Sequence, residues 1–324
     1  MDMGQTILTR RRLLGALGGA GAAALGVAAT TGASANDRWG AVVSPTGESL
    51  HDVSHTSGTA YAVGSSGRVL RRVAGEWSVS TEKGAGRSKT LSACAPTDDG
   101  DRLWFCGASG TVGFLDVESG NVTSHAKPVG AGDGFTDIAV FGGVGAERVY
   151  LAASDGTVVI GRHGSGKLQW ETRDTGGGYT ITGVDFHTRE RGHAVTNGSA
   201  VYRTTDAGAT WDRIGIADAQ VPLKAVVSGA QHVYAAGGSG RVFRLDCTCG
   251  RWTPFKPGNE TVSALVQRDG RLLGAGGSGS VVERTDTGYT LYGTGTGNHL
   301  NGAAIGGDYG PDIVVGDGGA ILER

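Results

Sequence analysis

The sequence has little proline, few aromatic residues and almost no net charge. It has only 7 proline residues, 6% aromatic residues and a formal net charge of −2. This mild charge gives no reason to expect nucleic acid or a membrane surface as a partner. Beyond the first 35 residues, no stretch is long and apolar enough to span a membrane. The 60 glycines follow no collagen period, so they indicate many short strands and tight turns.

Common catalytic motifs are also absent from the sequence. It contains no Gly-x-Ser-x-Gly elbow, no His-Glu-x-x-His pair and no phosphate-binding glycine loop. The eight histidines are scattered along the chain. We therefore expect a protein without catalytic residues, and we assign it no cofactor and no metal.

Residues 1–35 have the pattern of an export signal. Arg10, Arg11 and Arg12 precede Leu13-Leu14 and a run rich in glycine, alanine and leucine, which ends at Ala33-Ser34-Ala35. A basic start, an apolar middle and an Ala-x-Ala site are typical of signal peptides, and the arginine pair resembles twin-arginine signals. An ordinary secretory signal and an uncleaved anchor are the alternatives. We expect an extracytoplasmic protein (secreted, periplasmic or at the cell surface) that is not integral to the membrane after cleavage.

The remaining residues, 36–324, repeat with a period near 41 residues. A strand-like segment led by valine or isoleucine recurs at intervals of 39 to 46 residues. Its first residues are Val69, Val112, Val158, Val201, Val242, Val281 and Ile321. A second strand-like segment precedes each copy, and glycine-rich clusters separate the two in most copies, as hairpin turns require. This period matches the four-stranded blades of a β-propeller.

The first strand of each copy gives a third register. It begins with an apolar residue, a polar residue and then a small residue or aspartate: LHDV, LSAC, FTDI, ITGV, LKAV, VSAL and LNGA. Small third residues suit inner strands that converge on a narrow axis. The predicted fold class is all-β, a seven-bladed propeller of four-stranded antiparallel blades. We expect the blades over residues 49–82, 90–125, 134–173, 180–215, 222–256, 261–292 and 299–324.

The last copy lacks a fourth strand, because the sequence ends at Arg324 directly after the third. In four other copies a tryptophan marks the start of the fourth strand, and Trp39 follows the signal in the same way. We therefore expect residues 36–48 to form the outer strand of the last blade. Such a strand would remove the open edge and close the ring.

Five residues in the fourth copy resemble a known motif. Thr204, Asp206, Gly208, Thr210 and Trp211 match [Ser/Thr]-x-Asp-x-Gly-x-Thr-Trp, the Asp-box of BNR-type propellers. The surrounding repeat is similar to those of photosystem II stability/assembly factor-like propellers, whose members bind membrane-protein partners. We expect Asp206 to organise a turn by accepting backbone N–H bonds, rather than to act on a substrate.

The four cysteines lead to two further expectations. Cys94 and Cys106 are equally distant from Gly100, so on neighbouring strands they would face each other, and an oxidising compartment would favour a disulfide. Whether this bond forms is left open. Cys247 and Cys249 lie in the turn equivalent to the Asp-box. A disulfide that staples this turn is favoured over a metal site, because no neighbouring residue completes a four-ligand zinc spacing.

A polar ring is expected at the mouth of the central channel, formed by the second residue of each first strand. Two aspartates stand directly beside it. This channel-mouth ring consists of His51, Ser92, Thr136, Thr182, Lys224, Ser263 and Asn301, together with Asp52 and Asp137. The loops that enter these strands vary in sequence, which favours a binding surface there. The alternative is that the ring only solvates a water-filled channel.

These features favour an exported propeller without enzymatic activity. Its expected role is to bind a protein partner in the cell envelope as a scaffold or as an assembly or stability factor. A glycan-binding or sialidase-like propeller is the alternative. Sialidases need an arginine cluster, a Tyr/Glu pair and an aspartic acid, and they usually carry several Asp-boxes. This sequence has a single Asp-box.

Overall fold

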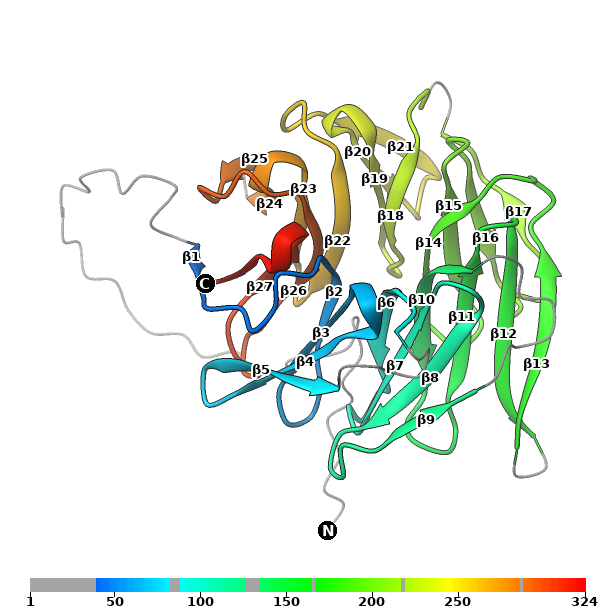
Figure 1. Cartoon of the computed structure of the whole chain (residues 1–324). Helices are drawn as coiled ribbons and strands as arrows, with labels where there is room; N and C mark the ends of the chain where they lie inside the picture. The colour runs from blue at the N-terminus through cyan, green and yellow to red at the C-terminus, as the bar shows by residue number, and fades with distance from the viewer. Residues whose placement is uncertain (1–38, 82–87, 126–133, 165–166, 217–218, 286–287) are drawn as a thin grey trace, which may run out of the picture.

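The computed structural model describes residues 39–81, 88–125, 134–164, 167–216, 219–285 and 288–324. The predicted export signal lies outside these residues. The described strands form seven sheets of four antiparallel strands each. Figure 1 shows them in chain order around a common centre. The predicted seven-bladed propeller is therefore confirmed.

Each of the first three blades is a meander whose strands are neighbours in sequence. Blade 1 consists of β2 (Leu50–His55), β3 (Ala60–Gly64), β4 (Val69–Val73) and β5 (Glu76–Thr81). Blade 2 consists of β6 (Leu91–Pro96), β7 (Arg102–Gly107), β8 (Thr111–Asp116) and β9 (Val122–Ser124). Blade 3 consists of β10 (Phe135–Phe141), β11 (Arg148–Ala153), β12 (Thr157–Gly164) and β13 (Lys167–Asp174).

Blades 4 to 6 follow the same order. Blade 4 consists of β14 (Ile181–Phe186), β15 (Gly192–Thr196), β16 (Val201–Thr204) and β17 (Asp212–Arg213). Blade 5 consists of β18 (Leu223–Val227), β19 (His232–Gly237), β20 (Val242–Asp246) and β21 (Arg251–Phe255). Blade 6 consists of β22 (Val262–Arg268), β23 (Arg271–Gly276), β24 (Ser280–Thr285) and β25 (Gly288–Gly293).

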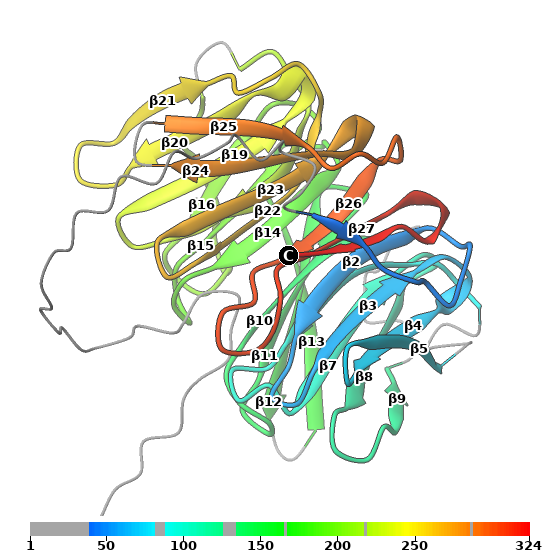
Figure 2. The same ribbon diagram turned by 90° about the vertical axis from the view of Figure 1, so that its left-hand side faces the viewer.

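Blade 7 joins the two ends of the described chain. It consists of β26 (Leu300–Ala304), β27 (Ile313–Gly316), β28 (Ile321–Glu323) and, as its outer strand, β1 (Gly40–Ala41). Gly40 pairs with Glu323 and Ala41 with Leu322. Figure 2 shows β1 beside the C-terminal end of the chain. The outer strand of the last blade thus comes from the segment directly before blade 1.

The hydrophobic core is divided into seven clusters, one in each interface between neighbouring blades. Side chains alternate between the two faces of a strand, so each blade contributes to two clusters. In β7, Leu103 and Phe105 face blade 1, whereas Trp104 and Cys106 face blade 3. Trp39, directly before β1, is buried between blades 6 and 7. The ring is therefore held by apolar contacts across every interface, including the one between blades 7 and 1.

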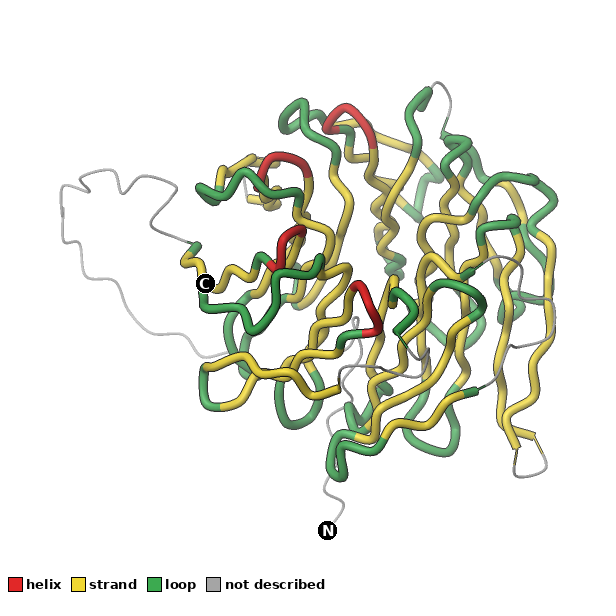
Figure 3. Tube along the Cα trace, viewed as in Figure 1, coloured by secondary structure: helices red, strands yellow, loops and turns green. Residues whose placement is uncertain are grey.

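The small third residue of the inner strands has a steric cause, as expected. A Cβ atom added to Gly302 would lie 2.6 Å from the Cα atom of Asp52 in the next blade. The inner strands meet too closely at this point for a larger residue. Among the described residues, short 3-10 turns join the second and third strands in four blades, and Figure 3 shows them in red. These turns are η2 (Ser65–Gly67), η3 (Gly238–Gly240), η4 (Gly277–Gly279) and η5 (Asp317–Gly319).

Candidate functional site

The central channel brings the whole predicted channel-mouth ring together. All nine of its residues line one cavity of about 90 Å³. Each of the seven inner strands has a register shift between its first and third residues. The second residue is therefore the extra residue of a β-bulge, and a bulge redirects its side chain. This repeated bulge explains why the seven side chains converge on the axis.

Several ring residues link one blade to the next. The hydroxyl of Thr182 donates to the carbonyl of Leu223 at 2.8 Å, and Thr136 makes the same bond to the carbonyl of Ile181. Asn301 Nδ2 donates to the carbonyl of Leu50 at 3.0 Å and so carries the pattern across the closing interface. In each case the acceptor belongs to the first residue of the next inner strand. These three side chains thus stabilise the ring.

The two acidic ring residues make a related contact. Asp52 accepts the backbone N–H of Cys94, and Asp137 accepts that of Val184, both at 2.9 Å and both from the following blade. Asp185 does the same for Ser228 at 2.7 Å, although sequence reasoning did not single it out. The signal in the sequence that could have identified Asp185 is its position on an inner strand. These carboxylates compensate backbone groups at blade interfaces instead of standing free in the channel.

The remaining ring residues differ in their contacts. His51 Nε2 lies 3.1 Å from Ser65 Oγ, and burial lowers the pKa of His51. Ser263 Oγ lies 2.7 Å from His299 Nε2. Within the described part of the chain, Ser92 and Lys224 make no side-chain hydrogen bond or ion pair. A cavity of this size holds a few water molecules but no sugar or peptide. A binding role for the ring stays a prediction, while the geometry assigns most of it to holding blades together.

The Asp-box residues form a closed set of turn contacts. Asp206 Oδ1 accepts the backbone N–H of Thr210 at 2.9 Å, and Asp206 Oδ2 accepts its hydroxyl at 2.6 Å. The Thr204 hydroxyl donates to Asp206 Oδ1 and accepts the backbone N–H of Gly208 at 2.9 Å. Burial opposes ionisation of Asp206, but these hydrogen bonds hold its pKa below the usual range. Trp211 packs edge-on against Phe186, with ring centroids 6.0 Å apart.

The expected opposition of Cys94 and Cys106 is wrong by one residue. Cys94 pairs with Phe105 and Cys106 with Ala93. The two cysteines therefore lie in different clusters, on opposite faces of blade 2, and both are thiols. A one-residue change of register moves a side chain to the other face of a sheet, which rules out the disulfide geometry.

The expected disulfide between Cys247 and Cys249 is also not formed in this structure. Both are exposed thiols. The turn is instead stabilised by Asp246, whose Oδ1 atom accepts the backbone N–H of Thr248 at 2.9 Å. An acidic side chain thus does what the disulfide was expected to do.

Two larger clefts lie away from the channel. The first, called the aromatic cleft, is lined by Tyr179, Tyr202, Trp211 and Arg213 and has a volume of about 310 Å³. The second, also about 310 Å³, lies between blades 4 and 5 and is lined by residues that include His187, His193 and Cys247. Burial, followed by the charge of Asp246, raises the pKa of the Cys247 thiol, which disfavours the reactive thiolate. Neither cleft was predicted from the sequence.

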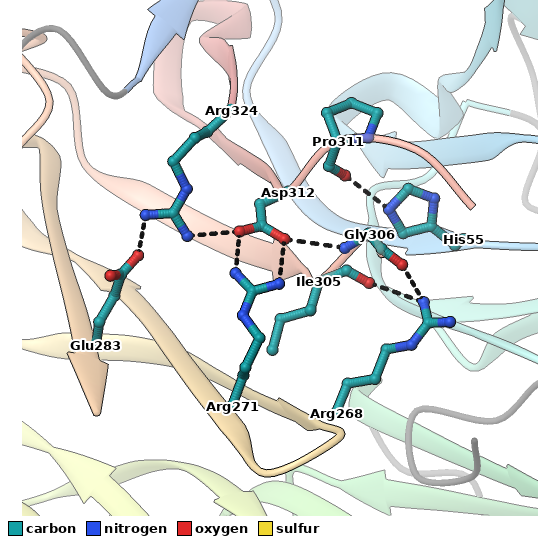
Figure 4. Close-up of polar contacts among 9 residues, drawn as sticks. All are labelled: His55, Arg268, Arg271, Glu283, Ile305, Gly306, Pro311, Asp312 and Arg324. Atoms are coloured by element: carbon teal, nitrogen blue, oxygen red, sulfur yellow. Dashed lines mark hydrogen bonds and ion pairs between the residues drawn. The ribbon is translucent and has the colours of Figure 1, made fainter. Parts of the chain in front are cut away.

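A charged network joins blades 6 and 7 (Figure 4). Asp312 is only 5% exposed and accepts hydrogen bonds from Arg271, from Arg324 and from the backbone of Gly306. Arg324 also pairs with Glu283 in blade 6. Burial alone would raise the pKa of Asp312, but the two arginines outweigh it and lower the pKa. This network reinforces the blade that is completed by β1.

A second set of contacts joins blades 7 and 1. Glu323 accepts two hydrogen bonds from Arg72 and one from Trp77 Nε1, all at 2.8 Å. At the end of β2, His55 lies 3.1 Å from the carbonyl of Pro311 (Figure 4). Burial lowers the pKa of His55 to about 4. Both interfaces of blade 7 are therefore held by polar contacts as well as by apolar packing.

The described residues contain neither a cluster of metal-ligating side chains nor a helix that could span a membrane. No three His, Cys, Asp or Glu side chains are grouped so that they could hold a metal ion in this part of the chain. No helix among the described residues has the length and apolar character to cross a membrane.

Comparison with known proteins identifies the fold. No protein-family model and no curated protein matches the sequence. Among solved structures, "YCF48 bound to D1 peptide" aligns with a TM-score of 0.69 and 14% identity over 88% of this chain and 94% of the other. This chain has the same propeller fold as that structure. The WD40 propeller domain of Doa1 aligns with a TM-score of 0.70 and 11% identity over 88% of this chain and 96% of the other.

A third similar structure belongs to a larger assembly. A chain of the Mitotic Checkpoint Complex aligns with a TM-score of 0.71 and 12% identity over 94% of this chain and 98% of the other. At these identities the likeness concerns the fold alone. The propeller scaffold is common to proteins of different function, so the function must be argued from the surface of this chain.

Proposed function

We propose that this chain is an exported propeller without enzymatic activity, which binds a protein partner as a scaffold or as an assembly or stability factor of an envelope complex. The observation that carries the proposal is the central channel. Its volume of about 90 Å³ is too small for a substrate, and most of its polar groups bond to neighbouring blades. We therefore place ligand binding at the outer surface, where the two larger clefts lie.

The similar structures agree with a protein ligand. One is described as bound to a D1 peptide, and another belongs to a checkpoint complex. Propellers expose many loops on a rigid ring, and such loops are common binding surfaces for polypeptides. The expected export signal supports a site of action outside the cytoplasm. An envelope complex is the partner class that follows from export and from the resemblance to assembly-factor propellers.

Cross-linking in intact cells tests the proposal. The full chain, with an affinity tag and expressed from its own signal, is cross-linked, purified from the envelope and analysed by mass spectrometry. We expect one envelope protein to be recovered in a fixed ratio to the propeller. Recovery of no partner in a fixed ratio, or turnover of a glycoside substrate by the purified chain, would contradict the proposal.

Export is tested separately. Changing Arg10 and Arg11 to lysine should retain the protein in the cytoplasm if the signal is of the twin-arginine type, because this pathway depends on the arginine pair. The matched change of Arg191 and Arg251 to lysine, two exposed arginines that make no ion pair with the described residues, should leave export by this signal intact. Unchanged export of the signal variant would exclude twin-arginine export without affecting the proposed binding role.

A further inference from the structure

The aromatic cleft has the size and position of a ligand site. On one side is the loop from Thr175 to Tyr179, which joins blade 3 to blade 4, and on the other side is the surface of blade 4. Its volume of about 310 Å³ lies at the lower end of the range of known ligand pockets. It is more than three times as large as the channel cavity.

Two glycines shape the aromatic wall of the cleft. A Cβ atom at position 198 would lie 2.5 Å from Tyr179 Cγ, so the ring of Tyr179 packs directly on the backbone of Gly198. A Cβ atom at position 177 would lie 2.1 Å from the hydroxyl oxygen of Tyr202. Tyr179 is nevertheless 55% exposed. One face of its ring is therefore supported by the protein while the rest is open to a ligand.

Some polar groups of the cleft are not used in contacts within the described part of the chain. Arg213 is exposed and makes no ion pair or side-chain hydrogen bond with the described residues. In the same part of the chain, Gly177 and Gly198 form no backbone hydrogen bond, and the buried Nε1 atom of Trp211 has no partner. Arg213 and the two glycines thus offer one positive charge and free backbone donors and acceptors.

This composition favours a peptide over a sugar. Sugar hydroxyls both donate and accept, so sugar sites need several directed polar side chains. Among the described residues that line the cleft there is no Asp, Glu, Asn, Gln or His. A peptide needs fewer such groups, because its backbone can bond to that of Gly177 and Gly198. Its rings can stack on aromatic side chains, and its carboxylates pair with arginine.

We propose that the aromatic cleft binds an extended peptide segment, which places a proline or aromatic ring against Tyr179 and an adjacent carboxylate on Arg213. The inference rests on the proposed function, because it supplies the binding surface for a protein partner. The partner is thereby characterised by its chemistry as an exposed segment that contains a ring followed by an acidic residue.

Labelled synthetic peptides test this inference with the full chain. Four seven-residue peptides with Gly-Ser flanks carry Trp-Asp, Pro-Asp, Trp-Lys or Gly-Asp at the centre, and binding is measured by fluorescence anisotropy. We expect Trp-Asp and Pro-Asp to bind more tightly than the other two. Tyr179→Ala should weaken binding of Trp-Asp about tenfold, the loss of one stacked ring contact. Arg213→Glu should reverse the preference, so that Trp-Lys binds better than Trp-Asp.

Two matched variants serve as controls. Val144→Ala removes another exposed apolar side chain, and Arg251→Glu reverses another exposed charge. Both should bind Trp-Asp like the unchanged protein, and all variants should unfold at similar temperatures. The inference is overturned if no peptide binds, if Tyr179→Ala binds normally, or if the charge preference does not follow position 213. Binding of a glycan that is lost in Tyr179→Ala would also overturn it.

The outcome can be separated from that of the proposed function. If the cross-linked partner is recovered equally well by the unchanged chain and by Tyr179→Ala and Arg213→Glu, the partner binds elsewhere and only the cleft assignment fails. If the unchanged chain recovers no partner in a fixed ratio, the proposed function itself fails.

Discussion

His55 should make the stability of the protein depend on pH in the mildly acidic range. Its Nε2–H donates to the carbonyl of Pro311, which fixes the neutral tautomer, and its buried Nδ1 atom has no hydrogen-bond partner among the described residues. A proton on Nδ1 would place a charge in a desolvated site. Arg268 and Arg72 also disfavour this charge, while Pro311 and Asp312 favour it less strongly than burial opposes it. The pKa falls from 6.5 to about 4 for these reasons.

The direction and size of the effect follow from proton linkage. In the unfolded chain the histidine takes up its proton near pH 6.5, but in the folded protein it does so only near pH 4. Between these values the unfolded state binds more protons, so acid lowers the free energy of unfolding. One pKa unit corresponds to about 1.4 kcal/mol, which gives a loss of about 2.5 kcal/mol between pH 7 and pH 4.5.

Urea denaturation at pH 7 and pH 4.5 checks this prediction in the unchanged chain and in His55→Gln. Glutamine keeps an N–H donor for the carbonyl of Pro311 but does not titrate. The loss of stability on acidification should therefore be smaller in the variant by about 2.5 kcal/mol. The reasoning is refuted if both proteins lose the same amount, or if NMR titration of the folded chain gives His55 a pKa near 6.5.

Three substitutions test other contacts by urea denaturation. Asp312→Ala removes the acceptor of Arg271 and Arg324 and should lower the free energy of unfolding by about 3 kcal/mol; a change below about 1 kcal/mol would show that the network adds little. Thr182→Val removes a hydrogen bond to the carbonyl of Leu223 in the next blade and should cost about 1–2 kcal/mol; an unchanged midpoint would contradict its linking role. Asp206→Ala should cost about 1 kcal/mol through the lost turn contacts and leave peptide and partner binding unchanged. Loss of binding at normal stability would instead assign Asp206 to a ligand site.

The fold was predictable because three strand patterns repeat seven times. Alternating apolar residues, glycine turns and a constant period all favour the same architecture, and the structure has the expected seven antiparallel sheets of four strands among its described residues. Even the small third residue of the inner strands has its expected cause, the close approach of Gly302 to Asp52. Such agreement arises because every repeat must form the same four-stranded blade and pack on its neighbours.

The strand register that separates Cys94 from Cys106 could not be predicted, because register depends on turn geometry. The backbone N–H of Thr97 bonds to the carbonyl of Arg102, so the turn contains four residues and its centre lies half a residue before Gly100. Sequence patterns locate such a turn only to within a residue. A disulfide can be predicted only if the register is known to the exact residue, because an error of one residue places the two thiols on opposite faces.

The channel-mouth ring could be located from the sequence, but its contacts could not. The β-bulge that directs each second residue towards the axis cannot be predicted from the pattern of apolar residues. The bond from Thr182 to Leu223 joins residues 41 positions apart in different blades. The aromatic cleft depends in the same way on the loop of Tyr179 lying over blade 4. Contacts between blades follow from the packing of the whole ring, and local patterns do not contain them.

The pairing of β1 with β28 also bears on how the chain can be rearranged. Gly40 lies directly opposite Glu323, so the first strand and the last strand are adjacent in one sheet. A short linker from residue 324 back to residue 39 would join them without moving a blade, and new ends could then be opened in a loop between any two other blades. In a circularly permuted protein of this kind, β1 would follow β28 as an ordinary fourth strand. The position of the two chain ends in the ring is therefore not dictated by the packing of the blades.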